Sequence, residues 1–80
     1  MTKEEILGKI KKFIVDEFKL EESEITENAT FLEDLGFDSL DVSTLLQDVE
    51  DMFDIRIPDE DLDKIATVGE LVNYIATKKA

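Results

Sequence analysis

The hydroxyl group of Ser39 lies between the carboxylates of Asp38 and Asp41. Asp38 has the side chain of a good helix N-cap, so Ser39 is predicted at the first position of a helix. Ser39 has no base beside it, and its hydroxyl is therefore predicted to be a passive attachment point rather than a nucleophile in the chain's own catalysis. Taken alone, this local pattern also fits ordinary helix-start chemistry, in which Asp caps the helix and Ser is tolerated.

The residue types exclude most enzyme classes. The chain has no His and no Cys, which removes Ser–His and Cys–His nucleophile systems and the metal sites built on those residues. Its three Gly residues are isolated, so no Gly-rich phosphate loop is present. A catalytic pair of acids would need a substrate cleft that a bundle of this size is not expected to form. We therefore predict a non-catalytic protein.

One arrangement of acids resembles a calcium loop. Asp59, Asp61, Asp63 and Glu70 stand at positions 1, 3, 5 and 12 of that pattern. Position 6, which needs Gly for a sharp turn, holds Lys64. We therefore predict no specific metal site. Loose binding of divalent cations, which relieves repulsion between the acids, is the alternative.

The charge is strongly negative and unevenly distributed. The net charge of −12 excludes nucleic acid and anionic membrane surfaces as partners. Residues 20–55 contain twelve acids and no Lys or Arg. The simplest interpretation of such a run is a solvated surface, but this asymmetry favours an acidic face that binds basic protein surfaces.

The length of 80 residues indicates one domain over residues 1–80. No segment has about 18 consecutive apolar residues, as a membrane span needs. The first residues lack the basic and apolar regions of a secretion signal. A cytoplasmic monomer is the expectation, although a processed organelle protein would look the same.

The first predicted helix covers residues 3–19, because apolar residues recur there every four positions. These residues are Ile6, Ile10, Ile14 and Phe18. Thr2 and Glu5 have capping-box spacing at its start. Residues 20–37 lose the pattern and are predicted to form a long loop. Its apolar anchors to the core are Ile25, Phe31, Leu32 and Leu35.

The second predicted helix covers residues 38–53, and the last covers residues 67–78, where Thr67 and Glu70 form another capping box. The inward row of the second helix is Val42, Leu45, Val49 and Met52. Between these helices, residues 59–65 are predicted to form one or two helical turns, with Leu62 and Ile65 facing inward. The expected fold is an all-α four-helix bundle of three main helices and one short helix.

A spaced set of motifs along nearly the whole chain resembles the acyl carrier protein family, of the bacterial type II fatty-acid synthase type. The matching segments are Ile25-Thr26, Ala29-Thr30-Phe31, Glu33-Asp34-Leu35-Gly36, Asp38-Ser39-Leu40-Asp41, Glu50-Asp51 with Phe53, Ile57-Pro58-Asp59-Glu60 and Tyr74-Ile75. The three residues Asp-Ser-Leu alone would be a weak signal, but the whole set is specific.

The resemblance implies that a phosphopantetheinyl transferase attaches 4′-phosphopantetheine to Ser39, with Asp38 and Leu40 beside the attachment point. The terminal thiol of that arm would hold acyl groups as thioesters. The resemblance also implies a docking face for acyl-processing enzymes with basic surfaces, formed by Asp38, Asp41, Asp48, Glu50 and Asp51. It further implies an interior that shelters the acyl chain, lined by Phe31, Leu45, Leu46, Phe53, Ile57, Ile65 and Ile75.

The chain departs from the bacterial fatty-acid pattern in the second helix. Thr44 replaces a usual Glu, Gln47 stands where Met is frequent, and Ser43 replaces an aliphatic residue. Fatty-acid synthesis is the leading pathway, and a carrier in polyketide, lipid A, D-alanyl or peptide assembly is the alternative. An unmodified acidic helical adaptor is a third hypothesis, from a different functional class.

Overall fold

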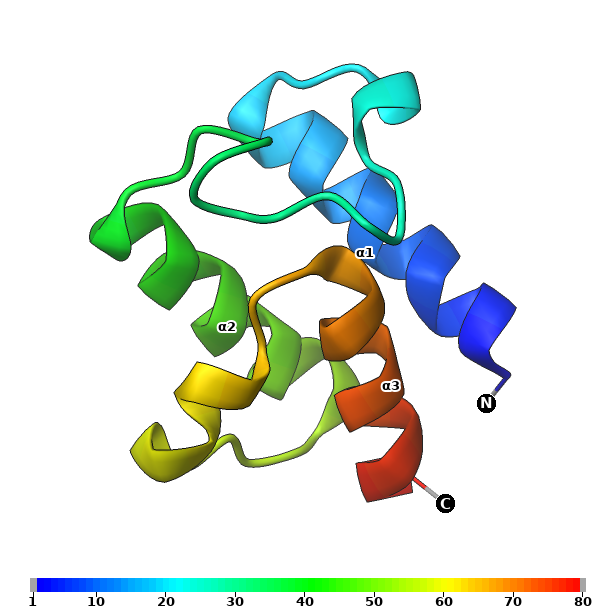
Figure 1. The fold of residues 1–80 in the computed structure, drawn as a ribbon. Coiled ribbons are helices and arrows are strands. Elements are labelled where there is room, and N and C mark those ends of the chain that lie inside the picture. Colours follow the sequence, from blue (N-terminus) through cyan, green and yellow to red (C-terminus); the bar gives the residue numbers. More distant parts are fainter. Residues whose placement is uncertain (1, 80) are drawn as a thin grey trace.

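The computed structural model describes residues 2–79, and three α-helices dominate this part of the chain. They are α1 (Lys3–Phe18), α2 (Ser39–Phe53) and α3 (Val68–Lys79), and two short 3-10 helices lie between them, η1 (Glu22–Glu24) and η2 (Asp59–Lys64) (Figure 1). The described residues include no strand, and one isolated bridge pairs Thr30 with Thr67. The predicted all-α fold with three main helices and a short one is confirmed, and η1 is an addition within the predicted loop.

The capping signals in the sequence determine where the helices begin. The Thr2 hydroxyl accepts a 3.2 Å hydrogen bond from the Glu5 amide, and the Glu5 carboxylate accepts a 3.0 Å bond from the Thr2 amide. The bonds to the backbone and hydroxyl of Thr2 lower the pKa of Glu5. The Thr67 hydroxyl likewise accepts from the Glu70 amide at 3.1 Å, ahead of α3. Both predicted capping boxes are confirmed.

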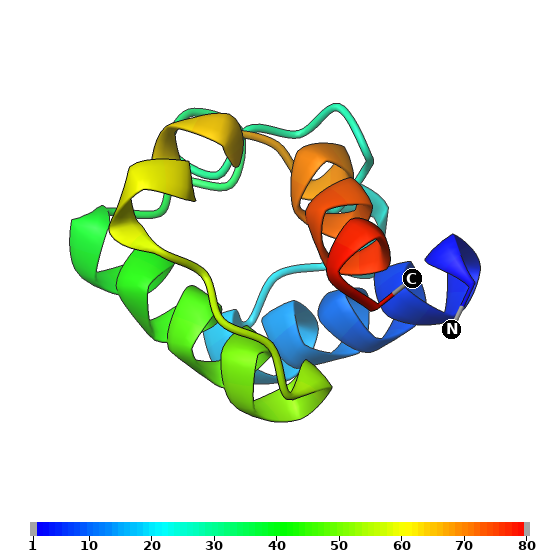
Figure 2. The same ribbon diagram turned by 90° about the horizontal axis from the view of Figure 1, so that it is seen from below.

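The three long helices and the loop between α1 and α2 share one apolar core. Figure 2 shows α1 and α2 along one side of the molecule, with η2 and α3 across from them. Ile6, Ile10 and Ile14 of α1 have no exposed surface. Their fully buried partners on the other helices are Leu45, Val49, Val68, Leu71 and Ile75. Such burial of aliphatic side chains is the main favourable contribution to the stability of a small domain.

The loop over residues 19–38 lies against the start of α3. The Val68 amide donates to the Ala29 carbonyl at 3.1 Å, and the Phe31 amide donates to the Ala66 carbonyl at 3.1 Å. The Phe37 ring packs at 4.4 Å from the Phe18 ring and 5.9 Å from the Phe31 ring, measured between centroids. The loop is therefore an ordered part of the fold.

Three residues that the sequence pattern placed inward are exposed. Leu32 is 61% exposed, and Met52 and Leu62 are each 40% exposed. Phe31 takes the inward position in its turn, so its neighbour Leu32 faces outward. Met52 lies at the edge of the apolar arc of α2, one residue before the helix ends. Leu62 lies on a surface groove, described below, rather than in the core.

None of the helices within residues 2–79 is long and apolar enough to cross a membrane.

Candidate functional site

Ser39 is the first residue of α2 and its side chain is exposed. The Asp41 amide donates a 2.8 Å hydrogen bond to Asp38 Oδ1, and the Asp38 amide donates a 3.1 Å bond to Asp41 Oδ2. The two carboxylates that flank Ser39 are therefore engaged by the backbone in a reciprocal cap. The Ser39 hydroxyl has no hydrogen-bond partner among the described residues, so it is accessible and is not activated by a base within the chain.

A groove of about 580 Å³ opens directly beside Ser39. The loop contributes Phe31 and Leu32 to its lining, η2 contributes Leu62, and Ile65 follows η2. Val42 lies one helical turn after Ser39 and also lines the groove. The exposed hydroxyl thus stands at the edge of a largely apolar depression.

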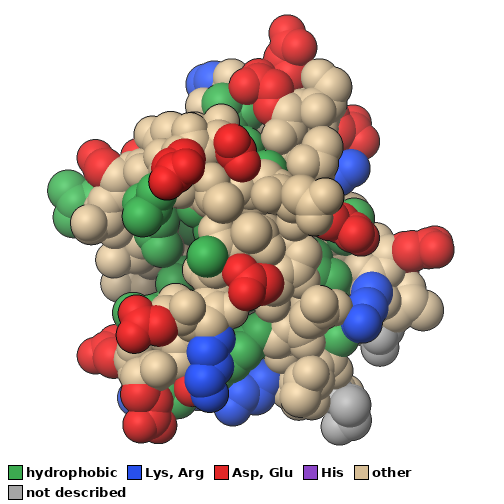
Figure 3. Space-filling view, viewed as in Figure 1, with side chains coloured by type: hydrophobic (Ala, Val, Ile, Leu, Met, Phe, Trp, Pro, Cys, Tyr) green, Lys and Arg blue, Asp and Glu red, His purple; other side chains and the backbone are tan. Residues whose placement is uncertain are grey.

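The residue that follows Ser39 is apolar and open to solvent. Leu40 is 77% exposed, the largest value among the exposed large hydrophobic residues within residues 2–79. Figure 3 shows hydrophobic side chains at the surface around the start of α2, with acidic side chains near them. An exposed apolar side chain beside an attachment point is suited to contact with another protein.

Four of the five predicted docking acids share one side of α2. Asp41 and Asp48 are seven residues apart, which is about two helical turns, and Asp38 and Asp51 flank them. Glu50 differs, because it lies about 200° around the helix from Asp48 at about 100° per residue. Its Oε2 atom accepts a 2.8 Å hydrogen bond from the Ile57 amide, and the side chain is half-buried. The structure thus gives Glu50 an internal partner.

Comparison with known proteins agrees with this geometry. The family model for a phosphopantetheine attachment site matches residues 8–75. The acyl carrier protein of an Exiguobacterium species is 49% identical over 78 residues, which cover 98% of this chain and 99% of that protein. The acyl carrier protein of Thermotoga maritima is 44% identical over 77 residues, covering 96% and 95% of the two chains.

This chain belongs to the acyl carrier protein family. Its cofactor is 4′-phosphopantetheine, attached covalently. A solved structure of the acyl carrier protein from Enterococcus faecalis superposes with a TM-score of 0.82 at 40% sequence identity, covering 98% of this chain and 99% of that one. The resemblance noted from the sequence motifs is confirmed.

The residues around Ser39 suit the cofactor of an acyl carrier protein. A phosphodiester at the Ser39 hydroxyl would lie at the N-terminus of α2, where the helix dipole favours an anion. The groove beside Ser39 offers apolar side chains to the rest of the arm and its load. Ser39, the predicted attachment point, is thus chemically compatible with a phosphate and lies open on the side of the groove.

The seven residues predicted for the acyl-sheltering interior of this acyl carrier protein fall into two groups. Phe31 and Ile65 line the groove beside Ser39. The other five are buried in the core, and they are Leu45, Leu46, Phe53, Ile57 and Ile75. Reasoning from the sequence missed Val42 and Leu62 as groove residues. Val42 could have been found from its spacing of three from Ser39, which places both on one helix face.

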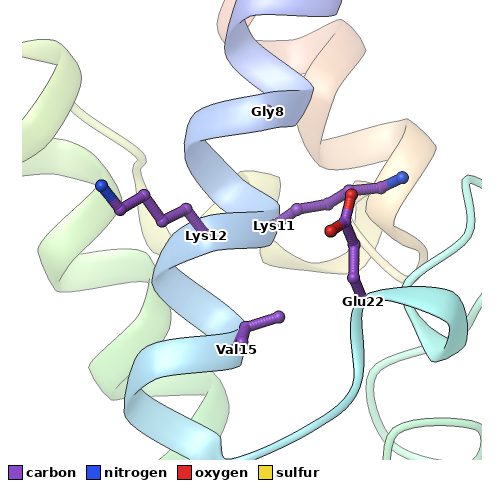
Figure 4. Close-up of a pocket in the computed structure, with 5 residues that line it drawn as sticks. All are labelled: Gly8, Lys11, Lys12, Val15 and Glu22. Atoms are coloured by element: carbon purple, nitrogen blue, oxygen red, sulfur yellow. The ribbon is translucent and has the colours of Figure 1, made fainter.

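A second hollow lies against α1 and shares no lining residue with the groove beside Ser39. It measures about 200 Å³ and is lined by Gly8, Lys11, Lys12, Val15 and Glu22. Figure 4 shows the Lys11 side chain extending toward Glu22, while Lys12 points to the other side of the helix. Because the two ammonium groups diverge, they do not converge on one anion.

Two of the four acids of the calcium-like pattern, Asp61 and Glu70, have hydrogen-bond partners elsewhere in the fold. Asp61 Oδ2 accepts a 2.6 Å hydrogen bond from the Tyr74 hydroxyl. Glu70 Oε1 accepts from the amides of Ala66 and Thr67 at 3.0 and 3.1 Å. Residues 2–79 hold no group of three or more acids placed to bind a metal ion.

Proposed function

We propose that this protein carries acyl groups as thioesters on a 4′-phosphopantetheine arm joined to Ser39 Oγ. The observation that carries the proposal is the exposed Ser39 hydroxyl, which lies without a hydrogen-bond partner among residues 2–79 at the edge of the apolar groove. The arm, when attached, supplies the terminal thiol. The chain contributes the attachment point, the groove and the docking surface, and it has no catalytic role of its own.

A separate phosphopantetheinyl transferase must activate Ser39. The nearby carboxylates of Asp38 and Asp41 each accept a hydrogen bond from a backbone amide, and the chain has no His. The base that removes the hydroxyl proton therefore belongs to the transferase. Transfer forms a bond from Ser39 Oγ to the phosphorus of the arm and breaks the bond between that phosphorus and the rest of the arm donor, which departs as a phosphate leaving group.

The groove suits the first part of an acyl chain. Phe31, Val42, Leu62 and Ile65 present apolar surface next to Ser39. Burial of each CH₂ group gains about 0.8 kcal/mol at best, and the cost of opening the bundle reduces this gain. The deeper residues predicted for the pocket are closely packed, so longer chains require the groove to extend toward the core.

Docking relies on a surface that we call the acidic face, formed by Asp38, Asp41, Asp48 and Asp51. Its partners are acyl-processing enzymes with basic surfaces, because charge complementarity of this kind steers association. Leu40 adds an apolar contact at the end of this surface. With a net charge of −12, copies of the chain repel each other, which supports a monomer. We propose that the protein acts in the cytoplasm.

Fatty-acid synthesis is the pathway that we propose. The curated relatives bear the name acyl carrier protein, and their similarity extends over nearly the whole chain. Thr44 and Gln47 alter the side of α2 next to Asp41 and Asp48, so a carrier role in another acyl-assembly pathway is the second candidate. Identification of the acyl groups bound in cells distinguishes the two.

A thermal unfolding experiment tests whether the protein shelters an acyl chain that is attached to its arm. The arm-bearing protein and its octanoyl form are compared, and a net gain of about 1 kcal/mol would raise the melting temperature by about 4–8 °C. Leu62→Gln, which makes the rim of the groove polar, should reduce the gain while leaving the arm-bearing form nearly unchanged. An octanoyl form that melts at or below the temperature of the arm-bearing form would contradict the proposal.

A further inference from the structure

Tyr74 links the last helix to the short helix η2. The Tyr74 hydroxyl donates a 2.6 Å hydrogen bond to Asp61 Oδ2, and Asp61 Oδ1 lies 3.4 Å from Lys64 Nζ. Lys78 Nζ lies 5.3 Å from the centroid of the Tyr74 ring, on its face. We call the Tyr74–Asp61 hydrogen bond the latch. Its acceptor is a charged carboxylate, and bonds of this type are stronger than those between neutral groups.

The latch is the principal polar contact that holds η2 in place. Within residues 2–79, no other hydrogen bond joins η2 to one of the other helices. The six residues of η2 include no buried side chain, and no side chain caps its start. A short 3-10 helix has little stability of its own, so its position depends on such contacts.

The same short helix forms one wall of the groove beside Ser39. Leu62 and Asp63 of η2 line the groove, and Ile65 follows directly. Asp61 meanwhile turns toward α3, where Tyr74 holds it. A displacement of η2 away from α3 would therefore move the groove wall.

We propose that Tyr74 is a specificity-determining positioning residue. By holding Asp61, it fixes η2 against α3 and limits how far the groove can extend, and this sets the length of acyl chain that the protein shelters. The proposal rests on the proposed function, because it concerns the same groove. Without the latch, η2 can move outward and the groove can accept more of a longer chain.

The test uses the arm-bearing protein loaded with a series of even-numbered acyl chains from butyryl to palmitoyl. For each chain, the melting temperature of the loaded form is compared with that of the same variant carrying the arm alone. The gain for the wild type should increase with chain length and then level off. In Tyr74→Phe, the levelling point should move to a longer chain by at least one step of the series.

Three further variants separate the latch from general stability. Asp61→Ala removes the same hydrogen bond while leaving the Tyr74 ring in place, and it should shift the levelling point as Tyr74→Phe does. Asp61→Asn keeps an acceptor for the hydroxyl and should restore the wild-type profile. Thr2→Ala weakens the start of α1, far from η2, so it should lower every melting temperature without moving the levelling point.

The outcomes distinguish failure of the inference from failure of the proposed function. If Tyr74→Phe and Asp61→Ala lower all melting temperatures but level off at the wild-type chain length, Tyr74 is only structural and the inference is overturned. If no acyl chain stabilises even the wild type, the sheltering function itself fails and the inference fails with it. The inference is supported if the levelling point moves to a longer acyl chain in both Tyr74→Phe and Asp61→Ala and returns to the wild-type length in Asp61→Asn.

Discussion

Gly69 lies so close to Glu27 that a Cβ atom at Gly69 would be 2.9 Å from the Glu27 carbonyl oxygen. The Gly69 amide also donates a 2.8 Å hydrogen bond to that oxygen. This contact fixes the loop between α1 and α2 on the first turn of α3. The loop in turn positions Phe31, which lines the groove beside Ser39.

Gly69→Ala should therefore destabilise the fold by about 1–3 kcal/mol, because the new methyl group meets backbone that cannot easily move. Gly8→Ala is the matched control. Gly8 lies within α1, where an added Cβ atom would have nothing within 4 Å, and Ala favours a helix over Gly by about 0.5–1 kcal/mol. Urea denaturation should show the two substitutions acting in opposite directions. Equal effects would show that Gly69 has no packing role.

Glu50 should contribute to stability through Ile57. Glu50→Ala leaves the part-buried Ile57 amide without its acceptor, so a loss of about 1–2 kcal/mol is expected. Glu50→Gln retains an acceptor oxygen and should recover most of that loss. Asp51→Asn, on the exposed side of α2, should change stability by less than about 0.5 kcal/mol. If Glu50→Ala and Asp51→Asn changed the unfolding free energy by the same small amount, the hydrogen bond from the Ile57 amide to Glu50 would not contribute to stability.

The latch should give stability a definite dependence on pH. Its hydrogen bond lowers the pKa of Asp61 below the ordinary value of 3.8. Partial burial, together with the bond to Asp61, raises the pKa of Tyr74 from 10.0 to about 12. The stability that Asp61 contributes to the fold is fully present above its ordinary pKa. It disappears as the pH falls through the lowered pKa of the folded state. The contribution of Tyr74 is present below pH 10 and disappears as the pH rises toward 12.

The difference in unfolding free energy between the wild type and Tyr74→Phe should therefore be flat from about pH 5 to 9 and should shrink at both extremes. Chemical denaturation across this range measures it. A difference that grows above pH 10 would contradict the raised pKa of Tyr74.

The acidic face should control the rate of arm transfer. Asp51→Lys should slow transfer to Ser39 by roughly 3- to 10-fold at low salt, chiefly by slowing association. Glu17→Lys makes the same charge change at an exposed position of α1 and is the control. The difference in transfer rate between the two variants should decrease at physiological ionic strength, because salt screens charges that are more than about 8 Å apart. Equal slowing by both variants would indicate a response to net charge rather than to this face.

Local signals in the sequence were sufficient to predict the helices, while Ser39 as the attachment point stays a prediction. The four-residue recurrence from Ile6 to Ile14 and the capping residues Thr2, Asp38 and Thr67 are local signals, and the structure confirms the elements they predicted. Local spacing works here because the cap and the apolar stripe of a helix lie within a few residues of each other.

Contacts between distant segments could not be predicted in the same way. The bond from the Ile57 amide to Glu50 and the contact of Gly69 with Glu27 depend on how the loops fold back. Hydrophobicity alone also placed Leu62 inward, although it lies on the rim of the groove. A rim residue and a core residue have the same residue type, so only the packed structure distinguishes them.

Ser39 as the attachment point of the arm is tested most directly by measuring the mass of the protein. The wild type, Ser39→Ala and Ser43→Ala are each incubated with a phosphopantetheinyl transferase and its arm donor, and their intact masses are measured. Ser43 is the matched control, because it lies one turn further along α2 and also lines the groove. We predict that the wild type and Ser43→Ala each gain the mass of one arm, and that Ser39→Ala folds normally and gains none. An arm on Ser39→Ala, or its absence from the wild type, would contradict the central claim.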